Sequence, residues 1–374
     1  MKDFIAVVNA YKQIDFSQRK AALATVVRVH GSSYRSPGAR MLITDDGRWT
    51  GSISGGCLEG DALRKARQVM NSNQAITVTY DTRDESNQNL GISLGCNGVI
   101  DVLIEPVTPT DENNPIKVFE RFIHAKEELA LATVCSAGKI GAKFVLEQKG
   151  KDKNIEGRLR SALGEIFVSK KSQIKNFFLD GEEAEVFLEL IQPTLSVLIF
   201  GGGFDARPVS KLAQSLGWHV QVTDECVAHL APTFFPDAKL SLCQREFVDR
   251  DFEITPYTAC VLMSHNYEYD RDVLRKLINT NTSYIGILGP RKRFDKMQEE
   301  FLTNGTVLSE SDLERIHSPI GLDIGAEAPD EIAVSIIAEI QAKFSKRNGK
   351  FLRANEGPIH HRDPESDQVY KRNF

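Results

Sequence analysis

A short apolar run that ends in three glycines constrains the fold of this chain more than any other feature of its sequence. Ser196–Phe200 is followed directly by Gly201–Gly203, and helical spacing begins at Ala206. An uncharged run of this length is typical of a strand buried on both faces, as in a parallel sheet. Glycines between such a strand and a helix let the backbone approach a phosphate, which the helix N-terminus attracts. The pattern predicts a Rossmann-type nucleotide-binding domain.

The residues after this turn alternate between expected strands and helices. We expect strands at Trp218–Thr223, Ala259–Met263 and Ser283–Leu288, and a last helix at Pro329–Phe344. Such alternation predicts a doubly wound parallel sheet with helices on both faces. Asp224 ends the second strand, about 20 residues after the glycines, where an acidic side chain binds a ribose hydroxyl. The alternative is a Rossmann scaffold whose nucleotide site is vacant.

Polar and glycine-rich segments follow later strands of the same expected sheet. His265 comes directly after a strand, at the carboxyl edge where ligands bind in such sheets. A long loop with Gly321 precedes the last helix, and loops of this kind often line a site. Gly289–Arg293 adds a basic cluster, for which a solvated helix start is the alternative.

The first half of the chain predicts a separate mixed α+β domain of short strands and glycine turns. Within it, Leu131–Val134 repeats Leu23–Val26 letter for letter, and Gly141–Lys143 follows at a similar distance to Gly38–Arg40. We infer a degenerate internal duplication, in which both copies complete one layered domain. A chance match of four letters is the alternative.

A loop between two expected strands of this domain carries candidate anion-binding groups. Gly31–Arg40 contains several hydroxyls and two arginines, Arg35 and Arg40. The forked guanidinium group suits phosphate or carboxylate. An exposed loop with solvated charges is the alternative.

A second glycine-rich segment carries a cysteine. Cys57 follows Ser54, Gly55 and Gly56 at an expected helix start. Successive backbone N–H groups there form an anion nest, and the helix dipole favours the thiolate, which is a nucleophile and a soft metal ligand. A small buried filler is the alternative. Cys96 also lies between glycines, but neither cysteine has a CxxC partner or a nearby histidine cluster, so a structural zinc site is not expected.

Composition limits the class of protein. The net charge of -5 over 374 residues argues against a nucleic-acid binder, which would carry a basic face. The first ten residues lack the pattern of a signal peptide, and the apolar runs are too short to span a bilayer. Six scattered cysteines in a chain of this length fit a reducing compartment. We therefore expect a cytoplasmic protein without membrane or nucleic-acid partners.

The motifs together, in this order, resemble the XdhC/CoxI family, the maturation factors of xanthine dehydrogenase and aerobic carbon monoxide dehydrogenase. The resemblance covers nearly the whole chain. It runs through GSSYRSPGARM, SISGGCLEGD, LGCNGVIDVLIEP, VLIFGGGFDARPV, SHNYEYD, YIGILGPRKR and HSPIGLDIGAEAPDEIAVSI. It implies a cofactor-handling domain, expected over residues 1–192, a Rossmann-type domain over 193–346, and a charged tail over 347–374.

The resemblance also implies a function. Members bind the molybdenum cofactor (molybdopterin) and deliver it to a xanthine dehydrogenase-type molybdoenzyme, as a chaperone that needs no net reaction. Cys57 falls on the family's GGC cysteine, where its thiolate is expected near the molybdenum, and Cys96 falls on the second glycine-flanked cysteine. A cysteine desulfurase is expected as a further partner, and a homodimer as the assembly. The residues expected to bind cofactor or nucleotide are Ser54, Gly55, Gly56, Cys57, Arg35, Arg40, Cys96, Gly201, Gly203, Phe204, Asp224, His265 and Gly321.

Two motifs depart from the family pattern. Phe204 stands where the family often has a histidine, and the usual Thr-His-Asp is here Ser264-His265-Asn266. The alternative function is an NAD(P)-dependent oxidoreductase, supported by the Rossmann half alone. His265 is its evident candidate acid or base, and NAD(P) or another nucleotide its ligand.

Overall fold

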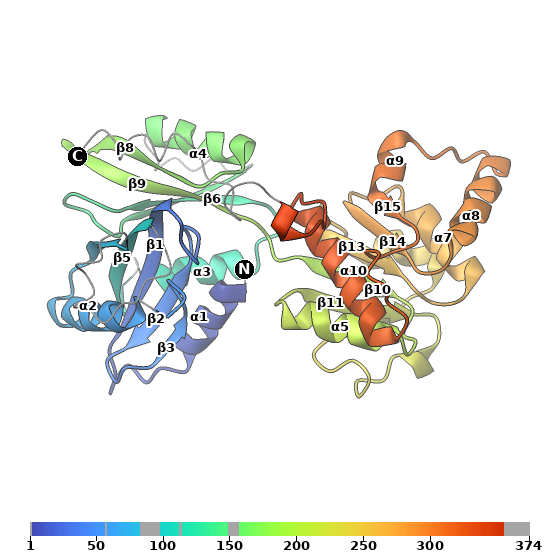
Figure 1. Cartoon of the computed structure of the whole chain (residues 1–374), viewed down its shortest axis with the longest axis horizontal. Coiled ribbons are helices and arrows are strands. Elements are labelled where there is room, and N and C mark those ends of the chain that lie inside the picture. The colour runs from blue at the N-terminus through green and yellow to red at the C-terminus, as the bar shows by residue number, and fades with distance from the viewer. Residues whose placement is uncertain (1, 57, 83–97, 112–113, 149–156, 355–374) are drawn as a thin grey trace. The chain divides into compact units, whose positions relative to one another are not determined.

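The computed structural model describes residues 2–56, 58–82, 98–111, 114–148 and 157–354 (Figure 1). The chain divides into two compact units, the first up to Pro193 and the second over Thr194–Ala354. Each unit is described by itself. In the described ranges, every helix is too short or too polar to cross a bilayer.

The first unit begins with a five-stranded antiparallel sheet. Its strand order is β3-β2-β1-β5-β4. The bounds are β1 Ala21–Gly31, β2 Arg40–Thr44, β3 Trp49–Gly51, β4 Ile76–Asp81 and β5 Gly98–Val107. Helix α2 (Glu59–Ser72) covers one face, because Ala62, Ala66 and Val69 recur at helical spacing and pack on alternate residues of β1.

A second, four-stranded antiparallel sheet follows in the chain. Its order is β7-β6-β9-β8. The bounds are β6 Leu129–Val134, β7 Lys143–Glu147, β8 Gln173–Leu179 and β9 Glu182–Ile191. Helix α4 (Gly157–Ser169) covers its outer face, with Leu159, Leu163 and Ile166 buried against the strands.

The second sheet repeats the first, so the predicted internal duplication is confirmed. The order β7-β6-β9-β8 matches β2-β1-β5-β4, and a helix crosses over at the same step. The register agrees as well: Thr25 pairs with Arg40 in the first copy, and Thr133 with Lys143 in the second. Even the turn is the same, since Gly38 donates to the carbonyl of Val26 as Gly141 donates to that of Val134.

The two sheets pack face to face between the two helices. Val27 and Leu103 of the first copy form a buried cluster with Phe187 of the second, while α2 and α4 are the outer layers (Figure 1). Helices α1 (Lys2–Lys12) and α3 (Pro115–Ile123) fill the open end of the layer between the sheets, where their apolar residues share one core. The first unit is thus a layered α+β domain.

Two buried ion pairs cross between the copies in a reciprocal way. Arg40 of the first copy binds Glu189 of the second through two contacts, Nη1–Oε1 at 3.1 Å and Nη2–Oε2 at 2.6 Å. Lys143, the counterpart of Arg40, pairs with Glu105, the counterpart of Glu189. All four side chains are buried.

The second unit is built on one six-stranded parallel sheet, as predicted. The order is β12-β11-β10-β13-β14-β15. The strand bounds are β10 Ser196–Phe200, β11 His219–Asp224, β12 Lys239–Leu242, β13 Thr258–Leu262, β14 Tyr284–Ile287 and β15 Ile316–His317. The helices are α5 Ala206–Ser215, α6 Val248–Asp251, α7 Tyr267–Leu277, α8 Arg291–Thr303, α9 Glu310–Arg315 and α10 Pro329–Phe344.

Helices cover both faces of this sheet. Helices α5 and α10 pack on one face, and α7 and α8 on the other (Figure 1). Because β10 lies between β11 and β13, the strand order reverses beside it. Ligands of doubly wound sheets bind at such a switch point, outside the carboxyl ends of the strands. The glycine turn after β10 lies there.

Candidate functional site

Two glycine-rich loops and Gly98 meet at one end of the first sheet. β1 ends at Gly31, which pairs with Gly98 at the start of β5. β2 begins at Arg40 and β3, which runs antiparallel to it, ends at Gly51, so the loop into α2 leaves from the same end. The hydroxyl of Thr82, after β4, donates to the carbonyl of Gly98 at 2.6 Å. Segments far apart in the sequence are therefore neighbours here.

Both cysteines predicted in this region, Cys57 and Cys96, lie outside the described residues. Gly56 and Leu58 flank Cys57 and are described, as is Gly98 beyond Cys96. Within the described ranges, no three histidine, cysteine or acidic side chains gather as ligands of a metal ion would.

A buried carboxylate organises the loop before α2. Glu59 accepts hydrogen bonds from the hydroxyl of Ser52 at 3.0 Å, from the backbone N–H of Ser54 at 2.9 Å, and from the Ser54 hydroxyl. Burial alone would raise the pKa of Glu59, but the bonds from Ser54 and Ser52 outweigh it and hold the pKa below its usual value. The loop is therefore tied to the first turn of the helix.

Ser54 is the centre of this loop. Its hydroxyl oxygen accepts from the backbone N–H groups of Gly56 and Leu58, each at 3.1 Å. The N–H of Gly56, which the sequence assigns to an anion nest, is thus used inside the loop. Gly55 and Gly56 are exposed, and a side chain at Gly56 would meet nothing within 4 Å.

The two arginines of the 31–40 loop are placed differently. Arg35 is partly buried and paired with Asp3 of α1. Arg40 is 2% exposed and lies between the rings of Phe4 and Phe119, 4.4 and 4.6 Å from their centroids. Because its guanidinium already binds Glu189, we assign Arg40 to the core rather than to a ligand.

In the second unit, the three glycines after β10 have different surroundings. A Cβ at Gly201 would lie 2.5 Å from the Cα of Ser264, and one at Gly202 would lie 2.6 Å from the carbonyl oxygen of His229. Gly201 also has a φ of +114°. At Gly203 the nearest atom is Cδ2 of His265, at 3.8 Å. The first two glycines let the chain pack against itself, whereas Gly203 leaves open space.

Asp224 lies at the end of β11, beside this turn. Its carboxylate accepts from the N–H of Gly202 and of Cys226, both at 2.8 Å, and lies 3.0 Å from Nδ1 of His229. These bonds fix the carboxylate at the end of β11, where the sequence predicts an acidic group for a ribose hydroxyl.

His265 lies beside Gly203. Its Nε2 lies 3.1 Å from Oδ2 of Asp205, and its backbone has a φ of +60°, which is uncommon for a residue other than glycine. Asn266 caps α7, accepting from the N–H groups of Glu268 and Tyr269. Phe204 is 65% exposed at the start of α5.

The remaining predicted residues of this unit serve the scaffold. The N–H of Gly321 donates to Glu339 at 2.9 Å, and a side chain at Gly321 would collide with Ser335. In the basic cluster after β14, Arg293 binds the buried carboxylate of Asp270 at 2.8 Å. Burial raises the pKa of Asp270, although Ser264 and Arg293 oppose the rise.

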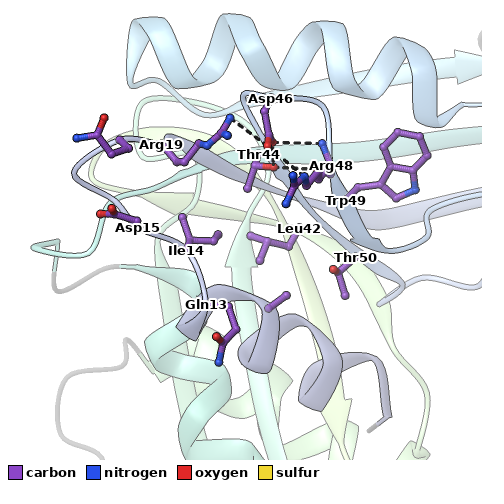
Figure 2. Close-up of a pocket in the computed structure, with 12 residues that line it drawn as sticks. Gln13, Ile14, Asp15, Arg19, Leu42, Thr44, Asp46, Arg48, Trp49 and Thr50 are labelled. Carbon is purple, nitrogen blue, oxygen red and sulfur yellow. Dashed lines mark hydrogen bonds and ion pairs between the residues drawn. The ribbon is translucent and has the colours of Figure 1, made fainter.

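A pocket of about 490 Å³ lies at the opposite end of the β2–β3 hairpin from the glycine loops, and no motif in the sequence predicts it (Figure 2). Figure 2 shows residues that follow α1, such as Gln13 and Ile14, across from the hairpin, with Arg19 and Arg48 paired to Asp46. The lining residues are Ala10, Gln13, Ile14, Asp15, Gln18, Arg19, Leu42, Thr44, Asp46, Arg48, Trp49 and Thr50. Its charged groups come from a turn and a hairpin tip, where solvated charges are ordinary.

Comparison with known proteins gives consistent matches along the chain. The model of the XdhC and CoxI family matches residues 17–81, and that of the XdhC Rossmann domain matches residues 197–340. A Bacillus subtilis protein named as a probable subunit of xanthine dehydrogenase is 30% identical over 328 residues, which are 86% of this chain and 93% of that protein.

Two further similarities cover most of the chain. The molybdenum cofactor insertion chaperone PaoD of Escherichia coli is 23% identical over 87% of this chain and 83% of its own length. A crystal structure described as a xanthine dehydrogenase from Bacillus halodurans superposes with a TM-score of 0.70, at 27% identity, over 92% of this chain and 97% of that one.

Proposed function

This chain belongs to the XdhC and CoxI family, and from that premise we propose that it is a maturation factor that binds the molybdenum cofactor and inserts it into a xanthine dehydrogenase-type enzyme. The cofactor is cargo, so the protein holds and releases it without a net reaction. The insertion chaperone PaoD, similar over most of its length, supports this role.

The observation that carries the proposal is the meeting of two glycine-rich loops, after Gly31 and after Gly51, with Gly98 at one end of the first sheet. A cargo with a metal, a ring system and a phosphate needs several kinds of contact in one place. Cys57 is our proposed thiolate ligand or neighbour of the molybdenum, since α2 begins two residues after it, at Glu59, and a helix start favours a thiolate. Cys96 is proposed to approach from the segment before Gly98.

The Rossmann unit supports a second binding function. We propose that a nucleotide binds on the turn at Gly203, with its ribose on Asp224 and a phosphate near His265. The open space at Gly203 and the oriented carboxylate of Asp224 favour this. Since a carboxylate accepts from a hydroxyl but repels a phosphate, a ligand with a free 2′-hydroxyl, such as NAD, is expected to bind better than NADP.

An NAD-dependent oxidoreductase remains the second candidate function. The pair of His265 and Asp205 beside the turn favours it, because a carboxylate orients a histidine that takes or gives a proton. Turnover of NADH with a carbonyl substrate, abolished in His265→Gln, is the result that this candidate requires.

We further propose the partners that the family implies. These are the recipient molybdoenzyme, a cysteine desulfurase and a second copy of this chain, all in the cytoplasm. Co-purification of the tagged chain with the recipient enzyme, and its loss on removal of the cofactor supply, would test the first of them.

The decisive experiment is mass spectrometry of small molecules released from the freshly purified protein. Molybdopterin or its nucleotide form is expected. Cys57→Ser is expected to retain less cofactor while keeping its melting temperature, because the volume change is small. Cys226→Ser is the matched control, since Cys226 is an exposed cysteine of the other unit. A Cys57→Ser protein that binds and delivers cofactor as well as the original would contradict the proposal.

A further inference from the structure

His265 has an unfavourable backbone conformation beside the proposed nucleotide site. Its φ is +60°, in the left-handed region that suits glycine and few other residues. Such a conformation persists only where the surrounding structure holds it. The imidazole lies at the glycine turn, with Cδ2 3.8 Å from the position of a Cβ on Gly203 and Nε2 3.1 Å from Oδ2 of Asp205. Whatever fixes the backbone of His265 therefore also places this side chain.

Both neighbours of His265 are tied to the first turn of α7. The Ser264 hydroxyl donates to Oδ1 of Asp270 at 2.6 Å, and it accepts from the backbone N–H of Asn266 at 3.1 Å. The side chain of Asn266 accepts from two backbone N–H groups at the start of the same helix. The residue between these two anchors has little freedom to take another conformation.

Asp270 is buried and takes its counter-charge from the segment after β14. Its side chain is 1% exposed, and its Oδ2 accepts from Nη2 of Arg293 at 2.8 Å. Arg293 ends the basic cluster Gly289–Arg293 and lies in the first turn of α8. A buried charge is costly unless it stays paired, so Asp270 ties the start of α8 to the segment that carries His265.

The same segment touches the glycine turn. A Cβ at Gly201 would lie 2.5 Å from the Cα of Ser264, so the two backbones are in contact there. Ser264 is thus held by a backbone on one side and by the carboxylate of Asp270 on the other. The segments joined in this way follow β10, β13 and β14, which are neighbours in the sheet.

We propose that Asp270 is a positioning residue of the nucleotide site, which holds His265 beside Gly203 through the hydroxyl of Ser264. The inference rests on the proposed nucleotide binding and adds the residues that prepare the site for it. A side chain that is fixed before the ligand arrives loses less conformational entropy on binding. Asp270 itself touches no ligand in this scheme.

The first test is calorimetry of the full-length protein with NAD. Ser264→Ala removes the link but leaves the pair of Asp270 and Arg293, so the affinity is expected to fall about tenfold while the melting temperature changes little. Ser264→Thr restores the hydroxyl and is expected to bind within about twofold of the original. Ser335→Ala is the matched control, because its hydroxyl also makes one short bond within the second unit, to the carbonyl of Leu322 at 2.5 Å.

The control is expected to bind NAD as the original does. Unchanged affinity in Ser264→Ala overturns the inference, and so does an equal loss in Ser335→Ala.

A double-variant cycle tests whether Ser264 acts through His265. His265→Asn removes the imidazole but suits the backbone conformation, which asparagine adopts more readily than most residues. In that background, Ser264→Ala is expected to cost no further affinity, because the group that it positions is already gone. A second loss of the same size would show that Ser264 acts on the ligand by another route, and would overturn the inference.

A measurement without ligand separates the inference from the proposed nucleotide function. Asp270→Asn keeps the size of the side chain but removes the charge that Arg293 binds. The imidazole proton signals of His265 in NMR spectra are expected to shift and broaden in this variant, and to stay unchanged in Ser335→Ala. If Asp270→Asn does not fold, the same signals are measured in Ser264→Ala.

Unaltered His265 signals overturn the inference whatever the protein binds. If the signals respond but the unaltered protein binds no NAD, the nucleotide proposal fails and the positioning of His265 stands.

Discussion

Single glycines in the turn after β10 serve two different purposes, which the sequence pattern alone does not separate. Gly201 and Gly202 are needed because the backbone just after β13 and the carbonyl of His229 approach closely. Gly203 faces space instead. Adding a side chain is therefore expected to destabilise the fold at Gly201 or Gly202. At Gly203 it is expected to leave the fold intact and to affect ligand binding instead.

Gly203→Val is predicted to keep the fold and lose the nucleotide. The new side chain meets only the edge of His265, at ordinary contact distance, but fills the space for a phosphate. Thermal melting is expected to be near that of the original protein, and calorimetry with NAD to show no binding. Gly201→Ala is the control, and it is expected to melt well below the original because its Cβ would overlap Ser264. A Gly203→Val protein that binds NAD normally would remove the turn from the site.

Thiol reactivity is predicted to separate the cysteines. Burial raises the pKa of Cys135, Cys243 and Cys260 to about 12 each. A thiol with such a pKa carries almost no thiolate near neutral pH, so it reacts slowly with iodoacetamide. Cys57 at a helix start is expected in the range of about 3.5–7.5 and should react fastest. The measurement is peptide mapping after brief labelling at pH 7, in a Cys226→Ser background because Cys226 is exposed. Equal labelling of Cys57 and Cys260 would contradict it.

The buried thiols also make the second unit sensitive to alkaline pH. The pKa of Cys260 is raised in the folded state, so the neutral thiol is favoured by folding. The raised pKa of Cys260 therefore contributes to the free energy of unfolding. This contribution is complete below the unfolded pKa of about 8.5 and is lost as the pH rises through about 12. Urea denaturation of Cys260→Ala against the original, at pH 8 and pH 11, is expected to show a smaller fall for the variant.

At the scale of elements, the sequence predicts most of the strands and the helices that follow glycine turns. Ser196–Phe200 and Pro329–Phe344 are expected and found with the same bounds. The helices α1, α3 and α4 are not expected from the sequence. They do not directly follow a strand and its glycine turn, and their apolar residues form a recognisable face only once the two sheets are packed together.

Arg40 illustrates what the sequence cannot show in the candidate site. The loop pattern indicates an anion-binding arginine, and the neighbouring residues give no other partner. Glu189, which binds it, lies 149 residues away, and the rings of Phe4 and Phe119 come from two unexpected helices. By contrast, the two glycine-rich loops meet because the strands beside them pair. The sequence does indicate such pairing, since the strand pattern of the first copy is repeated in the second.

Glu189→Gln is predicted to destabilise the first unit by about 3–5 kcal/mol, because it leaves the buried guanidinium of Arg40 without its counter-charge. The double variant Arg40→Met with Glu189→Leu is expected to recover most of this loss. Asp180→Asn is the control, since its pair with Lys139 is exposed and such pairs contribute about 0–1 kcal/mol. Urea denaturation measures all three. A loss for Glu189→Gln as small as that of the control would show that the pair is not buried in solution.

At the scale of the whole molecule, each unit has its own cores. The clusters under α5 and α10 and under α7 and α8 contain only residues of the second unit. A fragment spanning Thr194–Ala354 is therefore predicted to fold alone. Circular dichroism and a cooperative thermal transition would establish this, and NAD affinity equal to that of the full chain is expected. A fragment without a cooperative transition would contradict the prediction.

The reciprocal ion pairs of the first unit bear on the ancestry of the chain. In a symmetric dimer of one repeat, the twofold axis creates two identical ion pairs, each between the basic residue of one copy and the glutamate of the other. Fusion of two such genes keeps both contacts inside one polypeptide and leaves each copy free to diverge. The swapped partners Arg40–Glu189 and Lys143–Glu105 fit that history. On this view the glycine-rich loop before α2 evolved in one half of a former dimer. The other half then served only as a structural scaffold for it.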